Sequence, residues 1–201
     1  MHIIAGLGNP GVEHEGQRHN VGFMILDELA RYYQLGNFRP RSKFMGDIVE
    51  GMVGQKRVIA LKPTTFMNNS GKSIQSALNF YKLETQNLII IHDELDLPIG
   101  RIKTKFSGGS AGHNGLKSIT KHIGEKYWRI RIGIGKPHNN KNVENYVLSK
   151  FSIDESKWLK VASPTIAKAI PELLGDKPEH FGQQISKLQD TCNTLEKNNT
   201  Q

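Results

Sequence analysis

Hydrophobic residues follow two patterns that alternate along the chain. Short continuous apolar runs are typical of strands, and apolar residues at every third or fourth position are typical of helices. His2–Leu7 is an apolar run that ends in glycines, which indicates a buried strand. In Val21–Tyr33 the apolar residues recur every three or four positions, as in a helix packed on a sheet, and Asn20 precedes them as a candidate N-cap. Leu88–His92 is almost purely apolar, which predicts a central strand covered on both faces.

Asp47–Val53 and Arg57–Leu61 are strand-like segments separated by Gly54-Gln55, which predicts a hairpin. Similar patterns predict strands at Arg101–Phe106 and Tyr127–Ile134, and helices at Ser70–Leu83, Asn114–Ile123, Asp154–Leu174 and Pro178–Leu195. Pro164 and Pro171 predict an interruption of the helix that contains them. Since strands alternate with helices and the hairpin needs an antiparallel pair, the expected fold is α/β: a three-layer domain with a mixed central β-sheet flanked by helices.

Length and composition agree with one domain. The 201 residues suit a single core, so we predict one domain over residues 1–201 with a frayed polar tail at about 193–201. Hydrophobic residues make up 37% of the chain, and no apolar run is long enough to span a bilayer. The first residues lack the features of a secretory signal, so we expect a cytoplasmic protein with no membrane partner. Cys192 is the only cysteine, which excludes an intramolecular disulfide and a four-cysteine zinc site.

The positive charge is concentrated in one segment. The whole chain has a formal net charge of +8, whereas residues 101–150 contain 11 Lys and Arg against two Glu, a net charge of +9. Clustered cations bind polyanions by releasing condensed counterions, so this segment is a candidate nucleic-acid surface, and an ordinary solvated surface is the alternative. The cations concerned are Arg101, Lys103, Lys105, Lys117, Lys121, Lys126, Arg129, Arg131, Lys136 and Lys141.

Two glycine-rich segments suggest ligand loops. Residues 6–11 fit the G-x-G-x-x-G pattern of dinucleotide-binding proteins, but a polar stretch and not a helix follows Gly11, which argues against that class. Residues 107–115 lead from a basic strand into a predicted helix, and their backbone N–H groups suit a phosphate or an oxyanion. Neither this loop nor residues 131–137 has the Lys-Ser/Thr ending of a P-loop, which disfavours ATP or GTP hydrolysis.

Polar residues at the ends of apolar segments form a candidate hydrolytic site. His19 has the chemistry of a general base, and Asp93 follows the strand Leu88–His92 and would fix the imidazole tautomer. Asn9, Asn68 and Asn114 offer amide groups for a carbonyl oxygen or a peptide backbone. Taken alone, each of these residues also suits a structural role in a turn or at a helix end.

The cluster His92, Asp93, Glu94 and Asp96 raises the alternative of a divalent-metal site of a phosphohydrolase. In an extended segment His92 and Asp93 point to opposite faces, so the cluster does not converge without a turn. We therefore expect no metal and no cofactor.

Five sequence blocks follow one another along the chain: GLGNPG with RHNVG (residues 6–11 and 18–22), KPTTFMNNSG (62–71), HDELDLPIG (92–100), GGSAGHNGLKS (108–118) and RIRIGIGKP (129–137). In this order they resemble the signature blocks of the bacterial peptidyl-tRNA hydrolase family. The resemblance implies hydrolysis of the ester that joins a peptide to the 3′ ribose of tRNA, by a monomeric α/β protein without a metal.

The resemblance also implies roles for individual residues. His19 matches the family's catalytic histidine and Asp93 the carboxylate that orients it. Residues implied in substrate binding are Asn9, Asn68, Asn114, Met67, His113 and His14, the last standing where a tyrosine is common. Lys105 and Arg131 match cations that contact tRNA phosphates, and Lys141 lies beside the position of a third. A noncatalytic RNA-binding protein on the same fold remains the alternative, although pure binding does not need His19 and Asp93 together.

Overall fold

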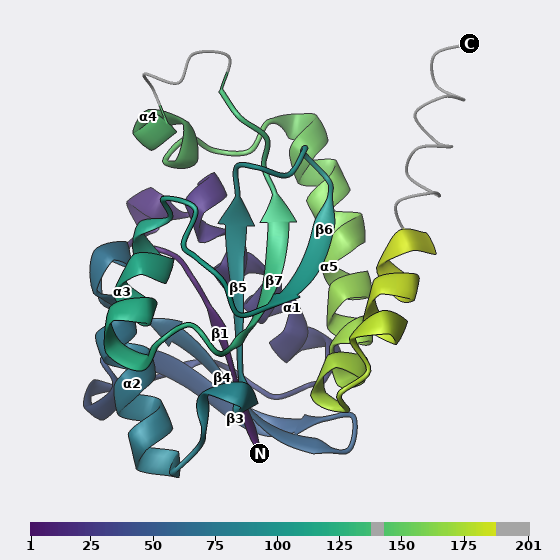
Figure 1. Ribbon diagram of the computed structural model, residues 1–201. Helices are drawn as coiled ribbons and strands as arrows, with labels where there is room; N and C mark the ends of the chain where they lie inside the picture. The colour runs from purple at the N-terminus through teal and green to yellow at the C-terminus, as the bar shows by residue number, and fades with distance from the viewer. Residues whose placement is uncertain (138–142, 188–201) are drawn as a thin grey trace.

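The computed structural model describes residues 1–137 and 143–187, and in this part of the chain a seven-stranded sheet forms the middle layer (Figure 1). The strand order is β2-β3-β4-β1-β5-β7-β6. The strands are β1 (His2–Gly6), β2 (Arg39–Arg41), β3 (Gly46–Val53), β4 (Lys56–Pro63), β5 (Leu88–Glu94), β6 (Ile102–Phe106) and β7 (Trp128–Gly133).

The sheet is mixed, as predicted. β1 runs parallel to both β4 and β5, and β5 runs parallel to β7. β3 and β4 form the expected antiparallel hairpin, and β2 and β6 add antiparallel edges. The carboxyl ends of β1, β4, β5 and β7 therefore meet at one edge of the sheet.

Helices cover both faces of the sheet. They are α1 (Val21–Tyr32), α2 (Ser70–Tyr81), α3 (Asn114–Ile123), α4 (Val143–Val147) and α5 (Ile153–Leu174), and residues 178–187 are also helical. α1 and α5 bury their apolar residues on one face, where Leu29 and Ile166 share a core with Ile91. α2 and α3 cover the other face, where Ile74 and Leu116 join a second core. This arrangement confirms the predicted three-layer α/β domain.

The central position predicted for the strand Leu88–His92 is confirmed, but its boundary was wrong. All seven residues of β5 are buried between β1 and β7, and the strand continues to Glu94. Asp93 therefore lies inside the strand, paired with Ile132 of β7, and not after it. Pairing with β7 continues through the polar residues Asp93 and Glu94, although hydropathy alone ends the strand before them.

The predicted interruption of the helix at Pro164 and Pro171 is wrong, because α5 runs continuously for 22 residues. Its buried residues, among them Leu159 before Pro164 and Ile166 after it, pack against the sheet core on both sides of this proline. Tertiary packing of this apolar face outweighs the cost of a missing backbone donor. A capping box of Ser152 and Glu155 also fixes the start of the helix.

Other differences from the sequence predictions involve short elements. Asn20 occupies the N-cap position of α1, but its side chain makes no capping bond and binds Asn9 instead. β2 and α4 were not predicted, because three and five residues are too few for a periodic signal. Lys141, Cys192 and the tail at 193–201 lie outside the described residues. Among the described helices, none is both long and apolar enough to cross a membrane.

One glycine brings the first turn of α1 against the carboxyl ends of β1 and β5. A Cβ at Gly22 would lie 2.3 Å from the backbone nitrogen of Leu7 and 2.4 Å from the backbone oxygen of Ile91. Only glycine permits this approach without moving the helix. The segment just before α1, which contains His19, is thereby held beside the end of β5.

Candidate active site

A cavity of about 520 Å³ opens at the carboxyl edge of the parallel strands. α1 follows β1 onto one face of the sheet, whereas α2 follows β4 onto the other, so the connections diverge and leave a crevice between them. The cavity is lined from four such segments, represented by Asn9 after β1, Met67 after β4, Asp93 in β5 and His113 before α3. The polar residues predicted from strand and helix ends are thus brought together.

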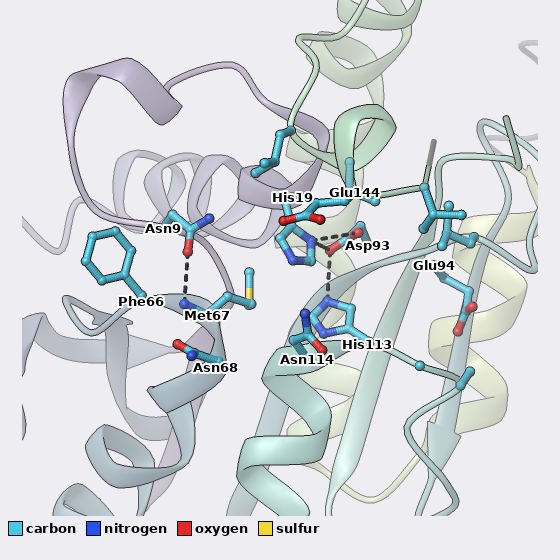
Figure 2. A pocket seen from close by; sticks show the side chains of 16 residues that line it. Asn9, His19, Phe66, Met67, Asn68, Asp93, Glu94, His113, Asn114 and Glu144 are labelled. Carbon is cyan, nitrogen blue, oxygen red and sulfur yellow. Dashed lines mark hydrogen bonds and ion pairs between the residues drawn. The ribbon is translucent and has the colours of Figure 1, made fainter. Parts of the chain in front are cut away.

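Asp93 binds two histidines at the base of the cavity (Figure 2). Nδ1 of His19 lies 2.9 Å from one carboxylate oxygen and 3.0 Å from the other. Nε2 of His113 lies 2.9 Å from the first of these oxygens, and the two imidazole centroids are 4.8 Å apart. The predicted pairing of His19 with Asp93 is present, and His113 is a second donor that sequence reasoning had placed only in the cavity wall.

These contacts fix the tautomers of both rings. Since the carboxylate accepts from Nδ1 of His19, that nitrogen carries the hydrogen and Nε2 keeps its lone pair. Nδ1 of His113 accepts from the backbone N–H groups of Gly115 and Leu116, where it caps α3, so His113 donates through Nε2. His19 is therefore arranged as a base, whereas both nitrogens of His113 are occupied.

The Asp93 carboxylate is held in its ionised form. Burial opposes ionisation, but the charges and hydrogen bonds of His113 and His19 outweigh it and keep the pKa of Asp93 well below its usual range. Only 3% of Asp93 is exposed. A dry carboxylate of this kind stabilises positive charge on either ring strongly.

Arg18 anchors the segment that carries His19. Its guanidinium donates from Nη2 to both oxygens of Glu155, at 2.9 and 2.7 Å, and from Nη1 to Oγ of Ser149 and the backbone oxygen of Lys150. It also lies over the ring of Tyr146, 4.6 Å from the centroid. These contacts tie the segment that carries His19 to α4 and to the start of α5, and the partners could not be predicted from the sequence.

Asn9 is oriented by two neighbours. Its side-chain oxygen accepts from the backbone N–H of Met67 at 2.9 Å, so its NH₂ group remains to donate elsewhere. The side chain of Asn20 binds the backbone N–H and carbonyl of Asn9, at 3.0 and 2.9 Å. Figure 2 shows the Asn9 amide at the cavity wall facing Met67. Asn20 is thus a supporting residue that sequence reasoning assigned to a helix cap.

The remaining predicted substrate residues divide into two groups. Asn68 and Asn114 are exposed and line the cavity together with Met67. His14 does not line it, and its Nδ1 lies 3.0 Å from the side-chain oxygen of Gln17. Sequence reasoning missed several wall residues. Some lie within the quoted motifs, namely Phe66, Leu95, Ala111 and Gly112, and the others, Val143, Glu144, Val147 and Leu148, lie outside them.

The potential metal ligands differ from those considered in the sequence. Ligand atoms of His19, Asp93 and His113 lie within 4.8 Å of one another, and this is a geometry that a metal ion accepts. The nitrogen–oxygen distances of 2.9 Å are those of hydrogen bonds, so the same atoms already satisfy each other. His92 is not among them, since its Nδ1 donates to the backbone oxygen of Asp93. Burial lowers the pKa of His92 to about 3.

The basic segment is partly surface and partly interior. Lys103, Lys105, Lys117, Lys121 and Lys126 are exposed on β6, on α3 and before β7. Arg129, counted with them from the sequence, is only 2% exposed and binds the backbone oxygens of Gly108 and Gly109. Arg131 is paired with Glu94, Nε to oxygen 3.0 Å. Arg129 therefore supports the glycine-rich loop, and the surface charge is smaller than the sequence suggests.

Comparisons with known proteins agree on one family. The chain matches the family model described as peptidyl-tRNA hydrolase over residues 3–194. It is 46% identical to the peptidyl-tRNA hydrolase of Rhodospirillum centenum over 188 residues, which is 94% of this chain and 82% of that protein. The corresponding protein of Azorhizobium caulinodans is 45% identical over 90% of this chain and 88% of its own length. The crystal structure of peptidyl-tRNA hydrolase from Acinetobacter baumannii superposes with a TM-score of 0.87 at 36% identity, covering 92% of this chain and 94% of that one.

Proposed function

Because the chain belongs to the peptidyl-tRNA hydrolase family, we propose that the cavity at His19 and Asp93 is where it hydrolyses the ester between a peptide and the 3′ ribose of tRNA. The observation that carries this assignment is the Asp93–His19 hydrogen bond, which uses Nδ1 of the ring and leaves Nε2 to accept a proton in a cavity built from several strand ends. The reaction frees tRNA for reuse in translation. Since translation supplies the substrate, we also propose a cytoplasmic location.

In this mechanism His19 activates water. Nε2 takes a proton from a water molecule as its oxygen attacks the ester carbonyl carbon, and the imidazolium is stabilised by the Asp93 carboxylate. The tetrahedral intermediate collapses when the bond from carbon to the ribose oxygen breaks, and the imidazolium returns its proton to that oxygen. The products are a free peptide carboxylic acid and a tRNA with an intact 3′ hydroxyl.

The asparagines position the peptide ester. The NH₂ group of Asn9, left over after its oxygen binds Met67, is suited to donate to the developing oxyanion or to a substrate carbonyl. Asn68 and Asn114 face the same cavity and offer both donors and acceptors to the peptide backbone. Amides do this without competing for the proton that His19 transfers.

The RNA lies on the basic surface beside the cavity. Lys105 of β6 is exposed and pairs in the sheet with Arg129 of β7. Arg131 lies two positions further along β7, so it is close to Lys105 in the sheet. We propose that both contact tRNA phosphates, with Arg131 doing so while paired to Glu94. Lys141 belongs to the same proposal from the sequence alone, and a monomeric state stays a prediction.

The test is ester hydrolysis by the purified protein. An N-acetylated aminoacyl-tRNA is incubated with wild type and with His19→Ala in the presence of EDTA, and release of the amino acid is measured. Release by wild type alone is the expected result. Tight tRNA binding without release by wild type would contradict the proposal and favour the noncatalytic RNA-binding protein.

A further inference from the structure

Three carboxylates line the cavity, and two of them have partners inside the protein. Asp93 accepts from His19 and His113, and Glu94 accepts from Arg131. Glu144, on α4, is exposed, and its side chain forms no hydrogen bond or ion pair with another residue that the structure describes. Figure 2 shows its side chain extending from α4 toward the cavity that His19 also lines. Glu144 is thus an acidic side chain of the cavity wall that has no partner among the described residues.

The charge of the cavity is opposite to that of the neighbouring surface. None of the described residues that line the cavity is Lys or Arg, although the chain has a net charge of +8. An unmatched carboxylate repels the phosphates of tRNA, so the nucleic acid lies toward the lysines of β6 and α3 and not toward Glu144. The part of the substrate near Glu144 is therefore the peptide.

The cationic groups that a peptide can place near Glu144 are those of its lysine and arginine side chains. The α-amino group of the esterified residue is acylated and neutral, whereas a lysine or arginine side chain carries a full charge. Val143, Val147 and Leu148 lie on the same wall as Glu144 and suit the aliphatic stem of such a side chain. An apolar wall that carries one carboxylate therefore suits a lysine side chain better than it suits a neutral side chain.

We propose that Glu144 is a specificity-determining residue, which favours peptidyl-tRNA whose C-terminal residue has a cationic side chain. The inference rests on the proposed function, because it places the ester at His19. A pair between exposed groups is weak, so the preference for a cation is about two- to fivefold in kcat/KM. It decreases with ionic strength, since salt screens an exposed pair.

The experiment compares substrates that differ only in the charge. One tRNA is acylated with Nα-acetyl-lysine or with Nα-acetyl-norleucine, which keeps the stem and lacks the ammonium group. The measurement is the ratio of kcat/KM for the two substrates, determined for wild type, Glu144→Gln and Glu125→Gln. Glu125 is an exposed glutamate in the same basic segment but outside the cavity, so its substitution changes the net charge equally.

The expected ratio is about two to five for wild type and Glu125→Gln, and close to one for Glu144→Gln. A charge reversal, Glu144→Lys, should make the ratio smaller than one. Equal ratios in wild type and Glu144→Gln would overturn the specificity alone. Failure of wild type to hydrolyse either substrate would overturn the proposed function, and the specificity with it.

Discussion

The base of the cavity and the basic surface beside it use polar groups in opposite ways. Asp93 and His19 are 3% and 8% exposed, and each has defined partners at hydrogen-bond distance. Lys105 and Lys117 are exposed, and neither forms an ion pair with a described residue. A buried polar group that loses its partner costs the full desolvation penalty, whereas a solvated cation loses one of many similar contacts. Substitutions should therefore have large, specific effects at the first region and small, additive ones at the second.

The largest effect is expected from His19→Ala. Hydrolysis should fall by about 10²–10⁴-fold or more, because no other group at this position takes the proton from water. Affinity for tRNA should change little, since the phosphate contacts lie on the other region. Single-turnover hydrolysis and tRNA binding, measured on the same preparation, separate the two. Undiminished hydrolysis in the folded variant would remove His19 from the mechanism.

Asp93→Asn should come next. Loss of the charge leaves the imidazolium without its counterion and allows the wrong tautomer, so turnover should fall by about 10²-fold. The two charge-assisted bonds should also make the variant less stable to urea by about 1.5–3 kcal/mol. The matched control is Asp96→Asn, an exposed carboxylate paired with Lys136, which should change neither quantity by much.

The stability deficit of Asp93→Asn has a defined pH dependence. Because the folded pKa of Asp93 is lowered, the stability it supplies is fully present above the unfolded pKa of about 4 and is lost as pH falls through the folded value. The deficit should therefore not grow as the pH rises above 5. Urea unfolding between pH 5 and pH 8 measures it, and a deficit that grows across this range would contradict the assigned charge state.

A smaller effect is expected from His113→Asn. Asparagine caps a helix well, so α3 should keep its start while Asp93 loses one donor. The loss of one hydrogen bond to a charged group predicts about a tenfold decrease in kcat. His113→Ala is the comparison, because it removes the cap as well. If the two variants were equally stable but differed in kcat, the capping role would be wrong.

On the basic surface, Lys105→Ala should weaken binding of different tRNAs by similar factors. The slope of log affinity against log salt should become shallower by about 0.9 for a duplex contact, or about 0.7 for a single strand. Arg131→Ala should change the slope less, because Glu94 already balances its charge. Salt titrations in the His19→Ala background measure both. Parallel slopes for Lys105→Ala and its parent would show that Lys105 is an ordinary solvated charge.

The smallest effect should come from chelation. Hydrogen bonds between His19, Asp93 and His113 already occupy the atoms that would bind a metal ion, and histidine activates water without one. EDTA should therefore leave the rate unchanged. Loss of activity that one divalent ion restores, with the tRNA intact, would show that these three residues are metal ligands.

The layers of the fold and most of the candidate site could be predicted from the sequence. The apolar run of β5 and the helical stripe of α1 are local patterns, and local patterns are what side-chain periodicity records. The strand ends also placed Asn9, His19 and Asp93 at one edge of the sheet. The quoted motifs pointed to the chemistry, because residues at these positions match those of a known family.

The partners of the polar groups, in contrast, became apparent only in the folded molecule. His19 and Asp93 are 74 residues apart, and Arg18 and Glu155 are 137 apart, so no local pattern links them. The same holds for Arg129, which pattern reasoning assigned to the surface and packing placed in the interior. α5 continues through Pro164 because the sheet core holds its apolar face. A proline inside a helix costs about 3 kcal/mol. Burial of several apolar side chains of α5 against distant strands contributes more, so packing determines the local structure where the two disagree.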